Sequence, residues 1–181
     1  VIAQVWSPQC LAIANFEDIQ GVELLIADSS DSQIESMFGH SLLRFVSKSG
    51  DSFNDLVLSF EAVIPSNLGQ SEKNFRGVTG TLGSRIAKVQ LIDVLSGYSL
   101  KENRGFSRYI LRLHDLQIHR LFELANNLEE LNKQIPNYSF FNNNCSRLLT
   151  WFFSLADIQL TTNALIPTQL PITFQLSLLS P

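Results

Sequence analysis

Short segments of strand type, followed by two helical segments, constrain the fold of this chain more than any other feature. Residues 22–27, 39–46, 56–61 and 108–113 are short runs rich in apolar residues, which favours strands. Residues 47–52 (Ser-Lys-Ser-Gly-Asp-Ser) supply turn chemistry between the second and third runs, which predicts an antiparallel hairpin. Residues 85–94 alternate partly and predict one more strand.

Amphipathic helices follow the strands. Asp115 is a good N-cap residue, and apolar residues recur after it at helical spacing, so we expect a helix that ends before Pro136. A second helix is expected to start near Cys145, and Ser7-Pro8 predicts a short one from Pro8 towards Asn15. Residues 65–83 hold several glycines and few periodic apolar residues, which indicates an ordered loop or lid.

Together these segments predict a single domain over residues 1–181, with an α+β fold in which a small antiparallel sheet packs against helices. Apolar residues make up 45% of the chain and charged residues 17%, which excludes intrinsic disorder. The net charge is −4 and the basic residues are scattered, so no nucleic-acid partner is expected.

No apolar run reaches the roughly 18 residues that a membrane-spanning helix needs. The chain starts at Val1 rather than Met, so we expect that a signal peptide has already been removed. A membrane anchor elsewhere and peripheral membrane contact stay open.

Cys145 is the first candidate for chemistry. It follows Asn142-Asn143-Asn144, and Asn144 as N-cap would place the thiol in the first turn of a helix. The helix dipole favours negative charge there, so we expect the thiol to ionise readily. The alternatives are a small buried core residue, or a disulfide with Cys10 that would disable the thiol.

His40 is the second candidate. It begins a predicted strand directly after Gly39, where a neutral imidazole could accept a proton from a nearby thiol. The alternative is a hydrogen-bonded histidine at a strand end. Such a pair usually needs a third group to orient the imidazole, and Ser59 and Glu61 share one face of the neighbouring predicted strand. Asn54 and Asp55 are weaker candidates because they lie at the turn.

No metal site or cofactor is expected. His114 and His119 are interpreted as capping or surface residues, and the histidines and cysteines lack the close spacing of a zinc site. The chain also lacks a phosphate-binding glycine loop and a Gly-x-Ser-x-Gly elbow.

Two segments resemble the signatures of the bacterial Lnb N-terminal periplasmic domain family. Residues 37–44 (Met-Phe-Gly-His-Ser-Leu-Leu-Arg) resemble its Phe-Gly-His segment, which runs into a strand with an Arg shortly after. Residues 138–146 (Tyr-Ser-Phe-Phe-Asn-Asn-Asn-Cys-Ser) resemble its aromatic stretch leading into Asn-Cys. Tyr98, the segment 102–104 (Glu-Asn-Arg) and the strand at 109–113 also match the family's layout. The resemblance covers roughly residues 22–155, followed by a C-terminal tail.

The resemblance implies a fold like the circularly permuted papain-like or NlpC/P60 enzymes, in which the histidine precedes the cysteine. It also implies a periplasmic or cell-envelope location. The named family member is an acyltransferase that moves a fatty acyl chain onto lipoprotein N-termini, and relatives of the fold act as amidases, peptidases and acyl hydrolases.

We therefore hypothesise a cysteine-nucleophile acyltransferase or hydrolase that acts on an ester or amide through a thioester. Cys145 would attack the carbonyl, His40 would act as base and then acid, and the Cys145 N–H with the Asn144 amide would stabilise the oxyanion. The substrate would be an acyl lipid, a lipoprotein or a peptide. The alternatives are a cell-wall peptide amidase or peptidase, and a non-catalytic interaction module on the same fold.

Overall fold

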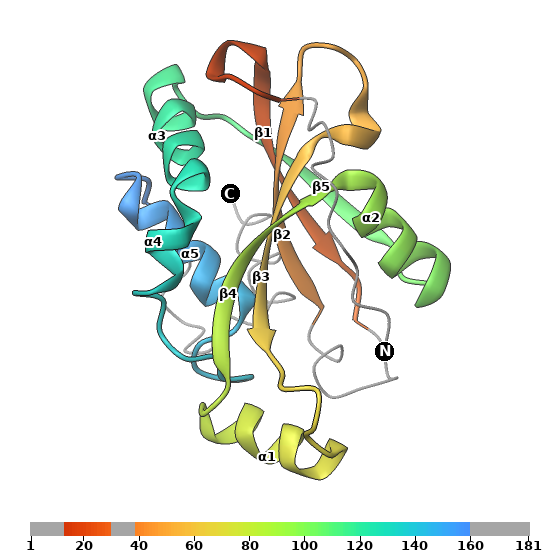
Figure 1. Ribbon diagram of the computed structural model, residues 1–181. Helices are drawn as coiled ribbons and strands as arrows, with labels where there is room; N and C mark the ends of the chain where they lie inside the picture. The colour runs from red at the N-terminus through yellow and green to blue at the C-terminus, as the bar shows by residue number, and fades with distance from the viewer. Residues whose placement is uncertain (1–12, 30–38, 160–181) are drawn as a thin grey trace, which may run out of the picture.

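The computed structural model describes residues 13–29 and 39–159. Within these ranges five strands form one antiparallel sheet in the order β4-β3-β2-β1-β5 (Figure 1). The strands are β1 (Ile19–Ala27), β2 (His40–Ser47), β3 (Leu56–Val63), β4 (Gly83–Gln90) and β5 (Phe106–Leu111). The predicted α+β class and the β2–β3 hairpin are confirmed.

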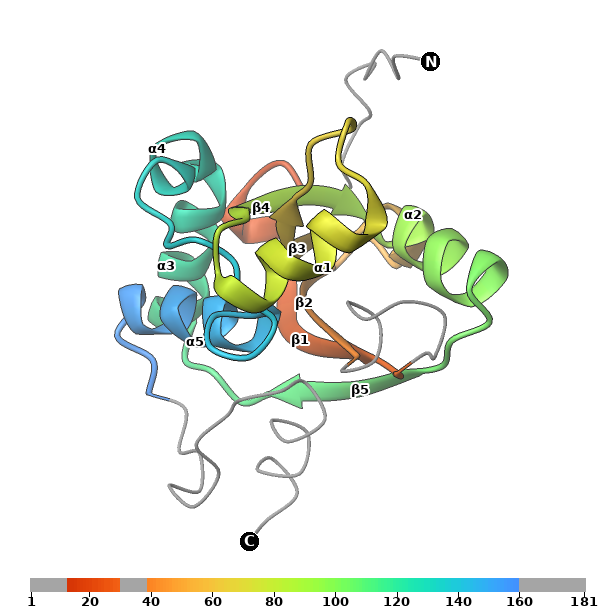
Figure 2. The ribbon, with the colours of Figure 1, turned by 90° about the horizontal axis from the view of Figure 1, so that it is seen from below.

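Helices cover both faces of this sheet. They are α1 (Gln70–Thr79), α2 (Leu91–Leu95), α3 (Asp115–Asn126), α4 (Leu128–Asn132) and α5 (Cys145–Leu155), with the short 3-10 helices η1 (Phe16–Asp18) and η3 (Ser52–Asn54) and the π-helix η4 (Ser96–Lys101). Viewed from below, α3, α4 and α5 lie on one side of the sheet and α2 on the other, with α1 across one end (Figure 2).

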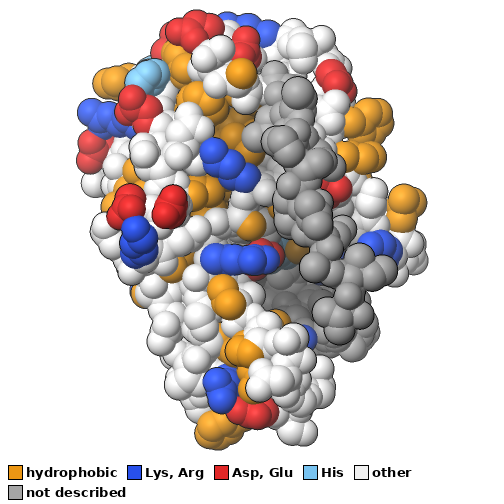
Figure 3. All heavy atoms as spheres, in the orientation of Figure 1, with side chains coloured by type: hydrophobic (Ala, Val, Ile, Leu, Met, Phe, Trp, Pro, Cys, Tyr) orange, Lys and Arg blue, Asp and Glu red, His pale blue; other side chains and the backbone are white. Residues whose placement is uncertain are grey.

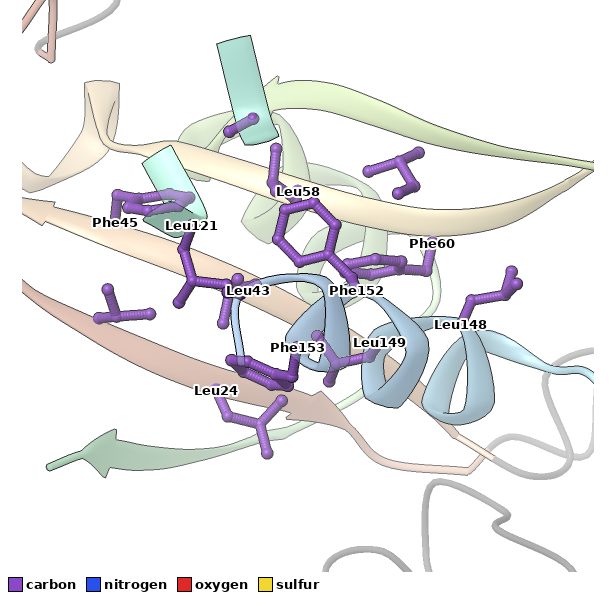
Figure 4. Close-up of a cluster of buried hydrophobic side chains, with 14 of the residues drawn as sticks. Leu24, Leu43, Phe45, Leu58, Phe60, Leu121, Leu148, Leu149, Phe152 and Phe153 are labelled. Carbon is purple, nitrogen blue, oxygen red and sulfur yellow. The ribbon is translucent and has the colours of Figure 1, made fainter. Parts of the chain in front are cut away.

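The main core lies between the sheet and α5. Apolar side chains at helical spacing on α5 meet alternate residues of the strands, and the full set of labelled side chains in Figure 4 belongs to this cluster: Leu24, Leu43, Phe45, Leu58, Phe60, Leu121, Leu148, Leu149, Phe152 and Phe153. Phe60 and Phe152 pack edge to face at 5.6 Å between ring centroids. Each such side chain contributes roughly 1.5–3 kcal/mol by leaving water, so this face anchors α5 firmly.

A smaller core lies on the opposite face. It joins alternate residues of the central strands to α2 through Leu25, Leu42, Val57, Leu91 and Val94. Because both faces are covered, consecutive residues of β2 and β3 are buried. This explains why the central strands are continuous apolar runs without clean alternation.

The prediction of a loop or lid at residues 65–83 is wrong for the centre of this segment, where α1 forms. Local signals stabilise this helix: Gly80 ends it with φ of 74°, and Arg76 pairs with Glu72 at 2.6 Å. Gly77 is its one buried residue, so the helix lacks the apolar stripe that marks helices in a sequence.

Two other predicted boundaries are also wrong. The strand expected at 85–94 ends at Gln90, because Leu91 and Val94 pack as one turn of α2. Leu91 is two residues after Val89, as in a strand, and three before Val94, as in a helix, so the pattern around it was ambiguous. The helix expected to reach Pro136 is interrupted at Asn127, whose backbone (φ −105°, ψ 28°) leaves the helical region between α3 and α4.

Some expectations fall outside the described residues. These include the start of the helix expected from Pro8, most of the polar loop after Asp28, and the C-terminal tail from residue 160. Residues 13–15, which end the expected first helix, are not helical.

Candidate functional site

Cys145 is the first residue of α5, as the sequence predicted. The Asn144 Oδ1 accepts hydrogen bonds from the N–H groups of Ser146 (3.1 Å) and Arg147 (3.3 Å), which is the geometry of an N-cap. Cys145 is a free thiol with 2% exposure, so the bridge to Cys10 that the sequence left open is not formed.

The Asn144 side chain is engaged at both ends of its amide. Its Nδ2 donates to the carbonyl of Phe140 at 3.2 Å, and the residue is buried. Both ends of the amide therefore shape the start of α5, and a contribution of the second Nδ2 hydrogen to an oxyanion site stays a prediction.

The expectation of an easily ionised thiol is wrong. Burial raises the pKa of Cys145 above its usual value, because a thiolate loses hydration there. The N–H groups of Ser41 and Ser146 and the Tyr138 hydroxyl oppose this effect by stabilising the thiolate. In the resting site, desolvation outweighs these donors, so the pKa of the Cys145 thiol stays above its usual value.

His40 is the first residue of β2. Its Nε2 lies 3.2 Å from the Ser59 Oγ, and its ring stacks on Tyr98 at 5.7 Å between centroids with 17° between planes. Burial and the nearby Arg104 charge lower the pKa of His40 to about 4, so the imidazole is neutral at ordinary pH. A neutral imidazole is the form that can accept a proton.

Of the two expected orienting residues, the structure brings Ser59 to His40. Glu61 instead pairs with Arg85 at 2.6 Å on the neighbouring strand. Asp55 is buried at the far end of the sheet, where its Oδ2 accepts from Arg44, and Asn54 bonds Asp51 in the turn. These last two residues have structural roles.

The end of β2 brings the two candidate segments together. β1 pairs with β2 out to His40, but the register between β2 and β3 stops at Leu42 and Ser59. Where β2 and β3 separate, the backbone N–H of Ser41 donates a hydrogen bond that stabilises the Cys145 thiolate. The sulfur therefore lies beside Ser41, the residue that follows His40.

His40 and Cys145 approach this strand end from different faces. His40 lies on the face of Leu42 and Tyr98, whereas Ser41 and Leu43 point towards α5, as the strand pleat requires. Both residues lie in the described part of the chain, and no hydrogen bond joins them there. Tyr98 is close to both residues. Its ring stacks on His40, and the pKa of Tyr98 is raised first by burial and then by the charge of Cys145.

A buried hydroxyl pair ties the two segments. The Oγ atoms of Ser41 and Ser146 are 2.9 Å apart and both residues are fully buried. Each serine directly follows one of the candidate catalytic residues. No local pattern in the sequence pointed to a role for Ser41, Ser146, Tyr98, Arg104 or Tyr138, although all five lie in or between the two signature segments.

The remaining histidines lie away from this site. His114 precedes α3, and its backbone N–H donates to the Gln117 Oε1 at 3.0 Å, so His114 rather than Asp115 is the N-cap residue. His119 is exposed near Glu123. Among the residues described, no group of three His, Cys, Asp or Glu side chains could hold a metal ion.

The face of the molecule shown in Figure 3 has no large patch of charge of one sign. Basic and acidic side chains are interspersed over the face shown in Figure 3. In the ranges that the structure describes, no helix has both the length and the apolar character needed to cross a bilayer.

The comparisons with known proteins identify the family. The chain has no significant match among curated proteins or solved structures. A family model described as the Lnb N-terminal periplasmic domain matches residues 9–178, which is nearly the whole chain. The chain therefore belongs to the Lnb N-terminal periplasmic domain family, which places it in the bacterial periplasm.

Proposed function

We propose that this protein is a cysteine-nucleophile acyltransferase or hydrolase that forms a thioester on Cys145. The observation that carries the proposal is a free thiol at the start of α5, surrounded by the donors of Ser41, Ser146 and Tyr138 and adjacent to the strand end that begins with His40. Donors grouped around one sulfur stabilise the negative charge that develops on it as it reacts.

The resting pair is neutral, so His40 acts as a general base during attack. A base whose pKa is near 4 and a thiol whose pKa is raised do not form a stable ion pair. As the sulfur bonds to the acyl carbonyl carbon, the thiol proton passes to the imidazole, which then protonates the leaving alcohol or amine. Water or an amine afterwards attacks the thioester and releases Cys145.

This route specifies one tautomer of His40. If Nε2–H donates to the Ser59 Oγ, the Nδ1 lone pair is free for the thiol proton. His40 and Cys145 approach the end of β2 from different faces of the sheet. The route therefore requires the imidazole and the sulfur to meet beyond Leu42, where β2 and β3 are no longer paired.

The oxyanion would lie against backbone donors, with the Cys145 N–H at the start of α5 as the first candidate. A cysteine helix packed on an antiparallel sheet, with histidine earlier in the chain, is the arrangement of the permuted papain-like enzymes, and we assign the finer fold on that basis.

The substrate class is an ester or amide, with lipoprotein N-acylation as the leading case and cell-wall peptide cleavage as its rival. The family description supports the first through location alone, because lipoproteins and acyl lipids are both present in the periplasm.

Trapping of the acyl-enzyme tests the proposal. The protein is incubated with a phospholipid, an activated short-chain ester and a cell-wall peptide, quenched in acid and weighed by intact mass spectrometry. We expect one acyl adduct on Cys145, none with Cys145→Ala, and adduct formation about 10²–10⁴-fold slower with His40→Asn. An unmodified thiol with all three donors would refute the proposal.

One observation favours a second function, a non-catalytic interaction module. Cys145 is buried and its pKa is raised, which are the properties of a core cysteine. In that case Cys145→Ala would leave every binding property intact, and His40→Asn would change only stability.

A further inference from the structure

We infer that Arg104 and Tyr98 are positioning residues for His40, a role that rests on the proposed function. Tyr98 supplies the surface on which the imidazole lies, and Arg104 holds Tyr98 in place.

Arg104 is fixed by contacts on several sides. Its side chain is 3% exposed, its Nε donates to the Asp28 carbonyl at 2.5 Å, and its Nη1 pairs with Glu102 at 2.9 Å. Its backbone N–H donates to the Tyr98 carbonyl at 3.0 Å, which closes the turn after η4. A side chain held through two of its three guanidinium nitrogens has little freedom, so it can serve as a rigid support.

The guanidinium lies over Tyr98. The Arg104 Cζ is 4.8 Å from the centroid of the Tyr98 ring, which is within cation–π range. Phe106 meets the same ring edge to face at 5.8 Å. Tyr98 therefore has a fixed ring plane before His40 is considered.

His40 is then held by two groups of different kinds. The Tyr98 ring determines the plane of the imidazole, and Ser59 determines which nitrogen points into the sheet. Together they leave one nitrogen, Nδ1, free in one direction. Positioning of this kind is worth large factors in rate because the base need not search for its orientation.

Arg104 also acts on His40 through its charge. Its Nη2 is buried and has no hydrogen-bond partner among the described residues, so Glu102 and Asp28 do not fully offset the guanidinium. A nearby positive charge disfavours imidazolium, which keeps His40 in its base form. Arg104 is the charged group that acts on His40, and the stacked Tyr98 ring is itself influenced by Cys145, Arg104, Glu102 and Glu61.

The test follows His40 itself by NMR, in a Cys145→Ala background that cannot react. Histidine side-chain titrations are compared for Arg104→Gln, Arg104→Lys and Tyr98→Leu. Arg108→Gln is the matched control, because it removes one positive charge from an exposed position of the adjacent strand β5. Thermal unfolding checks that each variant is folded.

We expect Arg104→Gln to raise the pKa of His40 by on the order of one unit, while Arg104→Lys and Arg108→Gln leave it close to the parent value. Tyr98→Leu should remove the upfield ring-current shift of the imidazole protons. An unchanged titration in Arg104→Gln, together with an unchanged imidazole signal in Tyr98→Leu, would overturn the inference.

A kinetic arm uses thioester formation in proteins that retain Cys145. In Arg104→Lys, which keeps the charge but loses the planar support, we expect the rate of acylation to fall at least tenfold with KM unchanged. If the parent forms no thioester at all, the proposed function fails, whereas the NMR result still decides whether these two residues hold His40.

Discussion

Arg44 shows how one residue can anchor the sheet that carries the site. Its guanidinium is buried between the Glu23 Oε2 at 2.9 Å and the Asp55 Oδ2 at 2.5 Å, and Asp55 also accepts from the Ser47 N–H. Two buried carboxylates thus share one buried cation, which joins β1, β2 and the turn before β3.

Replacement of Arg44 by Met should destabilise the protein by about 3–5 kcal/mol, because both carboxylates would lose their buried partner. Chemical denaturation measures this loss. Arg85→Gln removes an exposed pair with Glu61 and should cost about 0–1 kcal/mol. Equal effects of the two changes would show that burial of the Arg44 pair does not determine its strength.

The Cys145 thiol should react slowly with alkylating reagents. Burial raises its pKa, so the thiolate fraction is small at neutral pH and should increase only as pH rises beyond the usual thiol range. Iodoacetamide labelling between pH 6 and 10 tests this. Rapid labelling with a midpoint below pH 7 would instead indicate a preformed thiolate.

Ser59 should matter through the orientation of His40. Ser59→Ala removes the acceptor for Nε2–H, and we expect thioester formation to slow by about 10- to 100-fold, with partial recovery in Ser59→Thr. Glu61→Gln, on the same strand but paired with Arg85, is the control. Equal losses in Ser59→Ala and Glu61→Gln would contradict a specific role for the hydroxyl.

At the scale of elements, the contact between α5 and β2 decides whether the two candidate residues can cooperate. Apolar packing holds α5 against the strands, but such packing is non-directional. The bond between Ser41 and Ser146 adds direction, because it links one chosen turn of the helix to one chosen residue of the strand.

A double-mutant cycle measures this link. Ser41→Ala and Ser146→Ala should each destabilise the protein by about 1–3 kcal/mol, because each leaves a buried hydroxyl without its partner. The double variant should cost less than the two losses combined, and the difference is the coupling energy. Ser154→Ala, near the exposed end of α5, should be nearly neutral. Strict additivity would show that the hydroxyls are independent.

For the whole molecule, His40 links folding to pH. The folded pKa is about 4 and the ordinary value is 6.5, so between these values the unfolded chain binds more protons than the folded one. The free energy of unfolding therefore falls as pH decreases from about 6.5 to about 4. The loss is at most about 3 kcal/mol, and solvent screening makes it smaller because His40 is only partly buried.

Denaturation at several pH values in this window tests the linkage. His40→Asn should flatten the stability profile, whereas His119→Asn should keep the slope because His119 is exposed. A parent profile that rises as pH is lowered through this window would have the opposite sign and contradict the lowered pKa.

The sequence was sufficient to predict the elements that have strong local signals. The apolar runs of β1, β2 and β3, the turn between β2 and β3, and the Asn144 cap at the start of α5 all follow from local chemistry. The two family signatures predicted the family. Local signals failed at α1, which buries almost no apolar surface, and at Leu91, where strand and helix spacing coincide.

Tertiary structure alone decided the properties of the site. The order of the strands, the separation of β2 from β3 beyond Leu42, and the contact between Ser41 and Ser146 depend on residues far apart in the chain. The pKa of Cys145 shows why: a helix start favours the thiolate locally, but burial by surrounding elements opposes it more strongly. Sequence thus determined which residues are candidates, and packing determined their ionisation, partners and orientation.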